Sequence, residues 1–536
     1  MSLGRALARV LAALRVDEDA RRFARLVRRR LGLRRLAPPS GPPGPPSPEL
    51  CALLAADDRT LDVAAGALLI AEEDEPGIDV RYWLREVEAL AAGLRARLRG
   101  LSGARERLAA TNRYFFAELG FVSAPHRGTR RDEDRLAYLL LPGVLDRRAG
   151  HCVGLSTAYL ALGYRAGLPV FGVSAPGHFF VRWDGEGLRQ NVELTALGAG
   201  HPDEYYVARF GIGAAQVDRG VYLQNLRRRE VLVEILNNRA NYYWDRGDEE
   251  RAARDLDRVV TTSHNYARAL AGRGFLHLQR GHPEEALTDL RKALAIDPDY
   301  ARAHLLSGQA YMQQGWLERA RACFEHAVRL DGSDALAATY LGRIHAMRRD
   351  HEEALRWHER AIASDPRCHV AWTQLGRTRL ALGQTDEAGE AFREALRLAP
   401  HSLAARECLA LLARRRRRRS LTARAAAARL RRRYEALLRS APENDLLRVR
   451  YARFLLEAGL DADRALALLG DVVARKPTAY HLELLSRALS AAGRREEALA
   501  HLARAQDLDA ERGGVEAARL EGLRADLRGD RRSARA

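Results

Sequence analysis

The chain has 536 residues, of which 47% are hydrophobic and 29% are charged, and its formal net charge is +18. These values exclude wholesale disorder and a collagen-like or disulfide-stapled chain, and the length predicts two or more domains or a repeat array. The five cysteines lie far apart without a CxxC motif, so we expect a reducing, cytoplasmic compartment and no zinc knuckle. No apolar run reaches the roughly 18 residues that a membrane-spanning helix requires.

The positive charge is concentrated in two segments. Residues 1–48 carry 11 Arg against 3 acidic residues, and residues 403–440 carry 13 Arg against 2 Glu, which leaves the rest of the chain close to neutral. A basic chain favours nucleic acid or an anionic membrane surface as a partner. Because the whole sequence holds only two lysines, Lys292 and Lys476, the arginine excess also fits a coding bias.

Residues 1–48 are predicted to form a basic amphipathic helix followed by a proline-rich linker. Apolar residues recur at helical spacing up to residue 36 with arginines between them, and residues 38–48 hold seven of the nineteen prolines. We expect the helix to dock on its own protein, and binding to an anionic membrane surface is the alternative.

Residues 49–232 are predicted to form an α+β domain with a helical N-terminal part. The pattern is helical from residue 49 to about 110, with a break at Pro76 and Gly77. After a further helix with Leu155 and Tyr159 on one face come three short runs, "VFGVSA", "HFFVRWD" and "QNVELT". Such runs, rich in Val and Phe and divided by Gly and Pro, are typical of successive strands.

A 34-residue period runs through the chain beyond residue 232. Its recurring small residues are Gly274, Gly308, Gly342 and Gly376, and then Ala286, Ala320, Ala354 and Ala388. Small residues let two antiparallel helices approach closely, and the pattern matches the tetratricopeptide (TPR) repeat. The sequence therefore predicts an all-α TPR superhelix after the α+β domain, and a fold that is predominantly α overall.

Phasing the period from Val233 divides the rest of the chain into repeats. These are five TPR units over 233–402, a TPR-like unit with an Arg-rich insertion over 403–444, two further units over 445–512, and a capping helix or tail over 513–536. The insertion holds Arg414 to Arg419, for which we expect a solvated turn, with nucleic-acid binding as the alternative. Stacked repeats present a concave face, so the predicted partner is a protein or peptide bound in the TPR groove.

Three residues of the α+β domain form a candidate catalytic constellation, Cys152, His178 and Glu193. Cys152 directly precedes a helix, where free backbone N–H groups and the helix dipole favour a thiolate nucleophile. His178 follows a Pro-Gly turn at the start of a strand, so its ring can be aimed at the thiol as base and then acid. Asn191 and Glu193 lie two apart on the next strand and either can fix the imidazole; Glu193 is the first choice.

Other interpretations of these residues stay open. A lone cysteine at a helix start and a histidine on a strand are often packing residues. His151, next to Cys152, could stabilise a thiolate as an imidazolium without acting as the base. The histidines of the repeats lack metal-ligand spacing, so no metal and no cofactor are predicted.

Residues 49 to about 265 resemble the SirB-type transglutaminase-like proteins of bacteria. The resemblance rests on the ordered segments "ALLIAEEDEPGIDVRYWL", "GLPVFGVSAPGHFFVR", "NVELTALG" and "ILNNRANYYWDRGD". It implies a papain-like core with a Cys, His and Asp triad, which maps the nucleophile to Cys152, the base to His178 and the acid to Glu193. This chain departs from the family in carrying Glu193 where Asp is common, and it retains the cysteine that many SirB-type members lack.

Two main function classes follow from the sequence, and a third is binding of nucleic acid or an anionic surface through the two Arg-rich segments. In the first, the chain is a transglutaminase-like thiol amidase, peptidase or acyltransferase, and by resemblance we expect amide hydrolysis rather than cross-linking. In the second, the chain is a non-catalytic adaptor whose repeats gather a partner protein.

Overall fold

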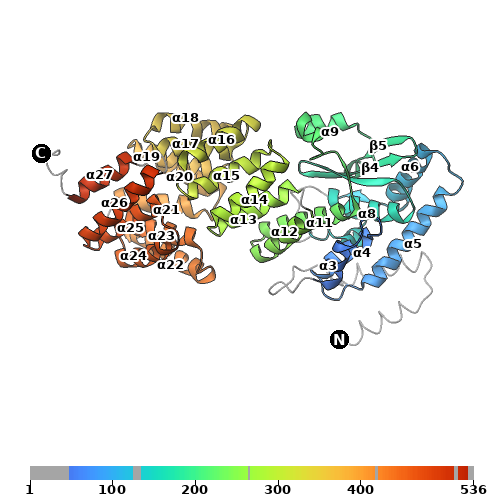
Figure 1. Cartoon of the computed structure of the whole chain (residues 1–536), viewed down its shortest axis with the longest axis horizontal. Coiled ribbons are helices and arrows are strands. Elements are labelled where there is room, and N and C mark those ends of the chain that lie inside the picture. Colours follow the sequence, from blue (N-terminus) through green and yellow to red (C-terminus); the bar gives the residue numbers. More distant parts are fainter. Residues whose placement is uncertain (1–46, 125–134, 264–265, 417–420, 512–516, 529–536) are drawn as a thin grey trace. The chain divides into compact units, whose positions relative to one another are not determined.

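The computed structural model describes residues 47–124, 135–263, 266–416, 421–511 and 517–528 (Figure 1). The chain divides into two compact units, Met1–Ala269 and Leu270–Ala536. Helices predominate in both units, and the described strands all belong to the first. The predicted basic helix and the linker up to residue 46 lie outside the described residues. Among the described helices, none is both long and apolar enough to cross a membrane.

Helices open the first unit. They are α3 (Pro48–Ala55), α4 (Val63–Glu72), α5 (Val80–Leu98), α6 (Ala104–Asn112) and the π-helical turn η1 (Arg113–Glu118). Ser47, Asp62 and Asp79 cap the first three, since each side chain accepts a backbone N–H of the first turn. Pro48 was expected to end an extended linker but is the first residue of α3, a position that suits proline because its missing N–H would have no helical partner.

A four-stranded antiparallel sheet follows in the order β5-β4-β3-β6. Its strands are β3 (Val170–Ala175), β4 (His178–Gly185), β5 (Leu188–Val192) and β6 (Asn225–Leu226). A separate two-residue parallel pair joins β1 (Val122–Ser123) to β2 (Ala149–Gly150). The three predicted strands are present, but the third begins two residues earlier than expected and ends at Val192, so Glu193 lies just beyond it.

Two tight turns set the geometry of the sheet. Pro176 and Gly177 join β3 to β4, and Gly177 has a φ of +67°, which glycine adopts without strain. Glu186 and Gly187 join β4 to β5, and both have positive φ, as a type I′ hairpin turn requires.

The two faces of the sheet are covered by different helices. On one face packs α8 (Cys152–Arg165), where a Cβ on Gly163 would lie 2.6 Å from the Val170 side chain. The other face carries Phe180 and forms an apolar cluster with Tyr206 of α9 (Asp203–Phe210). Because α8 is buried from Val153 to Gly163, it is the central element of this unit.

A buried ion network ties the first helical hairpin to the N-terminal helices. The hairpin is α11 (Arg228–Asp245) with α12 (Glu249–Thr262), both in the first unit. Arg239, which is fully buried, donates to Asp255 at 2.7 Å, to Glu73 at 2.8 Å and to Asp74 at 3.1 Å. Burial raises the pKa of Asp74 to about 6. The first hairpin therefore shares its polar core with α4.

Seven further helical hairpins and a final helix follow in the described part of the chain. The hairpins are α13 (Ala267–Gln279) with α14 (Pro283–Ile296), α15 (Ala301–Gln313) with α16 (Leu317–Leu330), α17 (Ala335–Met347) with α18 (His351–Ser364), α19 (His369–Ala381) with α20 (Thr385–Leu398), α21 (Leu403–Arg416) with α22 (Leu421–Ser440), α23 (Asp445–Glu457) with α24 (Ala462–Arg475), and α25 (Ala479–Ala491) with α26 (Arg495–Glu511). The final helix α27 (Ala517–Arg528) packs on α26 and buries Leu520.

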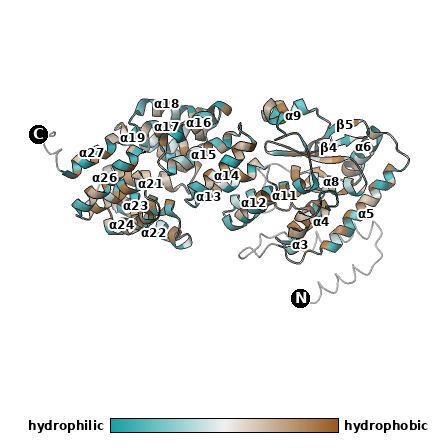
Figure 2. Cartoon of the chain, in the orientation of Figure 1, coloured by the Kyte–Doolittle hydropathy of each residue, from teal (hydrophilic) through white to brown (hydrophobic). Residues whose placement is uncertain are grey.

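The period of small residues sets the packing inside each hairpin. A Cβ on Gly308 would lie 2.5 Å from the ring of Phe324, and a Cβ on Gly376 would lie equally close to Phe392. Each glycine is thus the place where an aromatic ring of the second helix rests on the first. Figure 2 shows the resulting pattern, in which single helices carry both hydrophobic and hydrophilic residues.

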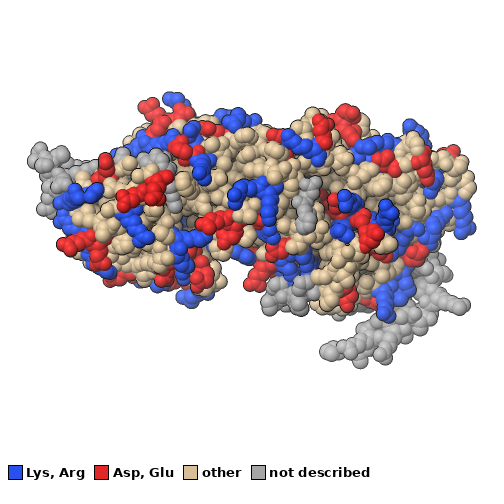
Figure 3. Space-filling view, viewed as in Figure 1, with Lys and Arg blue, Asp and Glu red and all other residues tan. Residues whose placement is uncertain are grey.

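The Arg-rich segment differs from its predicted form. Helix α21 continues to Arg416, so the first three arginines of the run from Arg414 are helical and not part of a turn. Residues 417–420 lie outside the described residues. On the face shown in Figure 3, acidic and basic side chains are interspersed, in keeping with the near-neutral charge outside the two basic segments.

A buried histidine replaces the aromatic ring in one repeat. His358 stands 34 residues after Phe324, is 0% exposed and packs under Gly342. Neither ring nitrogen has a hydrogen-bond partner among the described residues, and burial lowers the pKa of His358 to about 4. Both observations indicate that the position would accept an apolar ring better.

We expect His358→Phe to stabilise the protein by about 1–3 kcal/mol, because it removes two unsatisfied polar atoms. Unfolded His358 takes up a proton below about pH 6.5 while folded His358 stays neutral down to about pH 4, so this residue makes the wild type lose stability as pH falls through that window. Urea unfolding at both ends of the window measures the effect, which the variant should lack. The reciprocal change Phe324→His should destabilise, and a neutral result for both would contradict this account.

Candidate active site

The start of helix α8 positions Cys152. His151 has an extended backbone (φ −80°, ψ 175°), so Cys152 is the first helical residue, and its side chain is partly exposed. The first N–H groups of a helix have no carbonyl partner within it, and the helix dipole is positive there. A Cβ on Gly154 would lie 2.3 Å from the carbonyl oxygen of Tyr138, so close packing holds this helix start in place.

The β3–β4 turn positions His178. His178 is the first residue of β4, directly after the Pro176-Gly177 turn, and 15% of its side chain is exposed. Its ring lies nearly parallel to Phe210, with 5.4 Å between ring centroids, and further aromatic contacts come from Tyr206 and Phe180. The imidazole is therefore held in a defined plane by an apolar wall.

Strand register brings Glu193 to His178. Val181 pairs with Val192, so Glu193 follows opposite Phe180 and is the diagonal neighbour of His178 on the same face. The Oε2 atom of Glu193 lies 2.7 Å from Nε2 of His178. Its Oε1 atom accepts the backbone N–H of Thr195 at 3.0 Å and the Thr195 hydroxyl at 2.5 Å. The two bonds from Thr195 thus fix the orientation of the carboxylate that contacts the His178 ring.

The electrostatics of this group favour a charged imidazole. Burial alone would lower the pKa of His178, but hydrogen bonds to Cys152 and Glu193 raise it to about 9. Burial would raise the pKa of Glu193, but its bonds to His178 and Thr195 hold that pKa below its ordinary value. Because Nε2 is engaged by Glu193, Nδ1 is the ring nitrogen left for the sulfur. The structure therefore brings together Cys152, His178 and Glu193 in that order.

Asn191 lies on the same face but belongs to a different network. Its Oδ1 accepts from Nε of Arg182 at 2.7 Å, and its Nδ2 donates to Asp203 at 2.7 Å and to the His201 carbonyl at 2.9 Å. Asn191 stands opposite Arg182, four residues further along β4 than His178, or roughly 13 Å along the strand. The predicted alternative acceptor for the imidazole is therefore placed away from it.

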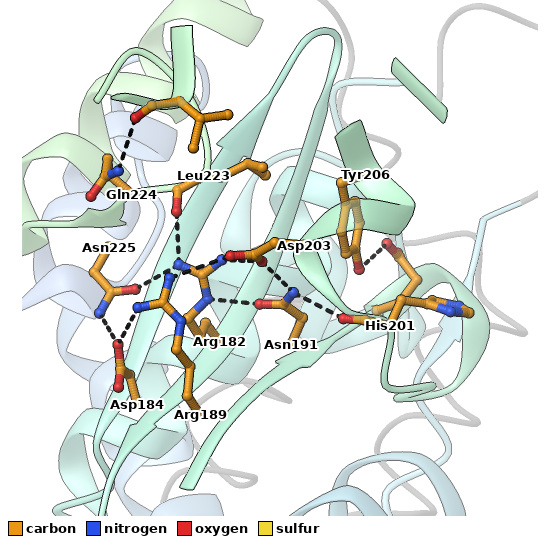
Figure 4. Close-up of polar contacts among 12 residues, drawn as sticks. Arg182, Asp184, Arg189, Asn191, His201, Asp203, Tyr206, Leu223, Gln224 and Asn225 are labelled. Atoms are coloured by element: carbon orange, nitrogen blue, oxygen red, sulfur yellow. Dashed lines mark hydrogen bonds and ion pairs between the residues drawn. The ribbon is translucent and has the colours of Figure 1, made fainter. Parts of the chain in front are cut away.

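Arg182 is the centre of that network, as Figure 4 shows. It is 0% exposed and donates to Asp203 at 2.6 Å, to the Leu223 carbonyl at 2.8 Å and to Asn225 at 3.1 Å. Burial lowers its pKa. These bonds fasten the start of α9 to β4 and β5, and so hold the connection that begins with Glu193.

His151, the second supporting residue named from the sequence, occupies the N-cap position of α8 without a side-chain capping bond. Its ring contacts Tyr138 edge-on, with 5.4 Å between the centroids. The sequence did not single out Arg182, Thr195 or Tyr206. An arginine within the apolar run "HFFVRW" was the available signal, because a charged residue inside a buried strand needs a partner. Among the described residues, no group of His, Cys, Asp and Glu side chains is arranged to hold a metal ion.

Glu193→Gln removes the charge beside His178 but keeps an acceptor for Thr195. Because folding raises the pKa of His178 to about 9, this pairing stabilises fully below about pH 6.5 and is lost as pH rises through about 9. The wild type should exceed the variant by about 1–2 kcal/mol near pH 6, and the difference should shrink above pH 9. Urea unfolding at the two pH values measures it, with an NMR titration of His178.

Glu118→Gln is the matched control for that change, because Glu118 pairs with Arg97 at 2.7 Å and has no histidine partner among the described residues. Its effect should not vary between pH 6 and pH 9. A pH-independent effect of Glu193→Gln would contradict the coupling.

Arg182→Met should destabilise the protein by about 3–5 kcal/mol, because it leaves the Asp203 carboxylate and the Asn191 amide without their buried donor. Arg189→Met is the control, since Arg189 donates to the same carboxylate at 3.3 Å but is 56% exposed, and it should cost at most about 1 kcal/mol. Urea unfolding of both variants tests the contrast, and equal losses would refute it.

Comparison with known proteins identifies the parts of the chain. Residues 81–237 match the family model of the transglutaminase-like superfamily, and residues 237–301, 277–344, 335–364 and 369–412 match tetratricopeptide repeat models. The chain therefore carries a transglutaminase-like domain followed by TPR repeats, as the sequence predicted.

Among solved structures, the repeats are similar to a thermophilic TPR protein of Thermus thermophilus, at 20% identity with a TM-score of 0.32, over 34% of this chain and 98% of that one. They are also similar to YrrB, titled a TPR protein with an unusual peptide-binding site, at 22% identity with a TM-score of 0.25, over 32% of this chain and 88% of that one.

Curated relatives match a large part of the chain. "UPF0162 protein" of Xylella fastidiosa, from strain 9a5c and from strain Temecula1, is 32% identical over 245 residues, which are 42% of this chain and 81% of the relative. At this identity and coverage, the chain belongs to the UPF0162 protein family.

Proposed function

We propose that the transglutaminase-like domain is a thiol amidase or peptidase, with acyl transfer as the related outcome, and that it uses Cys152, His178 and Glu193. One observation carries the proposal: the His178 ring lies between the Glu193 carboxylate, 2.7 Å from Nε2, and the Cys152 thiol at a helix start. We also propose that the domain belongs to the SirB-type group of transglutaminase-like proteins, in which the cysteine is not always kept.

The proposed reaction begins with a thiolate and imidazolium pair. The sulfur of Cys152 attacks the carbonyl carbon of an amide, a C–S bond forms, and the resulting oxyanion accepts hydrogen bonds from the helix-start N–H groups. As the tetrahedral intermediate collapses, the C–N bond breaks and His178 gives its proton to the leaving amine. This step leaves a thioester on Cys152 and a neutral imidazole.

The second half of the reaction restores the enzyme. His178 takes a proton from water as the water oxygen attacks the thioester carbon, and the C–S bond then breaks. The products are a carboxylic acid and the starting thiolate and imidazolium pair. A second amine in place of water gives acyl transfer. Glu193 stays ionised and stabilises the imidazolium, in keeping with its lowered pKa.

The TPR repeats supply protein–protein interaction in this proposal. Repeats that stack only on their neighbours form an extended concave surface, which suits a peptide or a helix of another protein. The repeats would bring a protein substrate or partner to the transglutaminase-like domain. A non-catalytic adaptor would use the repeats in the same way. An experiment that separates the enzyme from the adaptor must therefore measure the reactivity of the Cys152 thiol.

Iodoacetamide near pH 6 should alkylate Cys152 at least about tenfold faster than Cys51, because Cys152 lies at a helix start in hydrogen-bond contact with His178, whose imidazolium persists at this pH. Cys51 is exposed and serves as an ordinary accessible thiol in the same molecule. Burial raises the pKa of Cys323 to about 11 and also raises that of Cys368, so both should react slowly. Mass spectrometry of peptides at timed intervals measures each rate.

Two variants locate the base. His178→Ala should bring the rate at Cys152 to that of Cys51, whereas His151→Ala should leave it within about twofold. If His151→Ala alone slowed the reaction, the base assignment would be wrong. Equal rates at Cys152 and Cys51 in the wild type would reject the enzyme in favour of the adaptor.

A further inference from the structure

The turn that follows β5 closes on Glu193. The backbone N–H of Glu193 donates to the Ala199 carbonyl at 2.9 Å, and the Glu193 carbonyl accepts the backbone N–H of Gly198 at 2.9 Å. Between these bonds the chain reverses through Leu197 and Gly198, whose φ values are +54° and +84°. The backbone of Glu193 is therefore fixed by a short closed loop, so the position of its carboxylate depends on what holds the side chain.

Thr195 holds that side chain. A glutamate has several rotatable bonds, so a free Glu193 carboxylate could adopt many positions. Thr195 lies in the middle of the 3₁₀ turn η3 (Leu194–Ala196). Oε1 of Glu193 accepts the backbone N–H of Thr195 at 3.0 Å and the Thr195 hydroxyl at 2.5 Å. One residue thus supplies two donors to one carboxylate oxygen, while the other oxygen lies 2.7 Å from Nε2 of His178.

The two bonds from Thr195 differ in what they require of the side chain. The backbone N–H would be present in any residue except proline. The hydroxyl bond exists only with a hydroxyl side chain, and at 2.5 Å it belongs to the short, charge-assisted class of O–H···O bonds. Such bonds are about twice as strong as neutral ones. The choice of threonine at this position therefore matters through its hydroxyl.

Among the described residues, Tyr206 is the other hydroxyl residue that contacts this carboxylate, but its contact is weaker. The Tyr206 hydroxyl lies 3.4 Å from Oε2 of Glu193, which is beyond the usual range of an O–H···O bond. The tyrosine is fully buried, and its ring stacks on Phe180 with 3.9 Å between the centroids. Packing therefore accounts for Tyr206, whereas the orientation of the carboxylate depends mainly on Thr195.

The charge on Glu193 acts on His178. The titratable groups that face the imidazole are Cys152 from α8, Glu193 from the end of β5 and Tyr206 from α9. Burial raises the pKa of Tyr206, so this side chain stays neutral. Burial opposes a charged Glu193, but its bonds to His178 and Thr195 hold its pKa below the ordinary value. A change at residue 195 should therefore reach the imidazole through the carboxylate.

We propose that Thr195 is a positioning residue of the candidate active site, whose hydroxyl holds the Glu193 carboxylate ionised and aimed at His178. The carboxylate then keeps the ring protonated beside the Cys152 thiolate. The inference rests on the proposed function and adds the residue that sets the pH range over which the thiolate and imidazolium pair persists. No bond forms or breaks at Thr195, so a variant that keeps the hydroxyl should behave as the wild type does.

An NMR titration of His178 in the full chain measures this effect directly. The wild-type ring should titrate near pH 9. Thr195→Val keeps the branched shape and the backbone N–H but loses the hydroxyl, and should lower that midpoint by about 0.5–1 pH unit. Thr195→Ser keeps a hydroxyl and should titrate within about 0.2 pH unit of the wild type. Urea unfolding confirms that each variant is folded.

Alkylation by iodoacetate gives a second measurement, at the thiol. The reagent carries a carboxylate, so its rate at Cys152 should be highest while His178 is an imidazolium and should fall as the ring loses its proton. This fall should lie about 0.5–1 pH unit lower in Thr195→Val than in the wild type. Cys51 is an exposed reference thiol in the same molecule, and its pH profile should be the same in both proteins.

Thr157→Val is the matched control for the loss of a threonine hydroxyl. Thr157 lies in α8 and is fully buried, and its hydroxyl donates to the Val153 carbonyl at 2.8 Å and not to a carboxylate. This variant should lose stability, but the titration midpoint of His178 should not move. The comparison separates a general loss of packing from an effect that passes through Glu193.

Three results would overturn the inference: a His178 midpoint that does not move in Thr195→Val, an equal shift in Thr157→Val, or no recovery in Thr195→Ser. Equal iodoacetate rates at Cys152 and Cys51 in the wild type would reject the proposed enzyme by a separate route. In that case the His178 midpoint alone still decides whether Thr195 acts on the imidazole through Glu193.

Discussion

The pairing of Val181 with Val192 sets the position of the polar groups around His178. It places Glu193 one pleat from the imidazole and Asn191 opposite Arg182, so one register decides which side chain braces the ring and which fills the buried network. A shift of one residue would turn Glu193 to the other face of the sheet. The tight β4–β5 turn and the bonds of Arg182 to Asp203 and Asn225 oppose such a shift.

The repeats depend on a different constraint, the close approach of two helices at a small residue. The same geometry accepts the ring of Phe324, Phe392 or His358, which shows that shape governs this position more than polarity does. The residue after the small one is free of that constraint and is only partly buried in α13 and α17. There the array can vary from Phe275 to Arg343 without loss of the fold, and a binding surface can change while the packing stays constant.

The features predicted from the sequence are those that depend on local pattern. The 34-residue period, the three Val- and Phe-rich strands and the places of Cys152 and His178 at element starts all follow from spacing and turn residues. Features that depend on tertiary geometry could not be predicted from spacing and turn residues. The separation of Asn191 from His178, for example, follows from strand register. A two-residue strand such as β6 is too short to show a strand pattern in the sequence, so it could not be predicted.

The ion network around Arg239 makes the first repeat hairpin different from those that follow. The fully buried guanidinium of Arg239 donates to Asp255 of α12 and to Glu73 and Asp74, which follow α4. Separating the hairpin from the N-terminal helices would therefore leave unpaired charges in the core. The family model for the transglutaminase-like domain accordingly ends within α11, at residue 237, where the first repeat model begins. The domain and its first hairpin are therefore one folding unit, and only the later repeats can vary independently of the candidate active site.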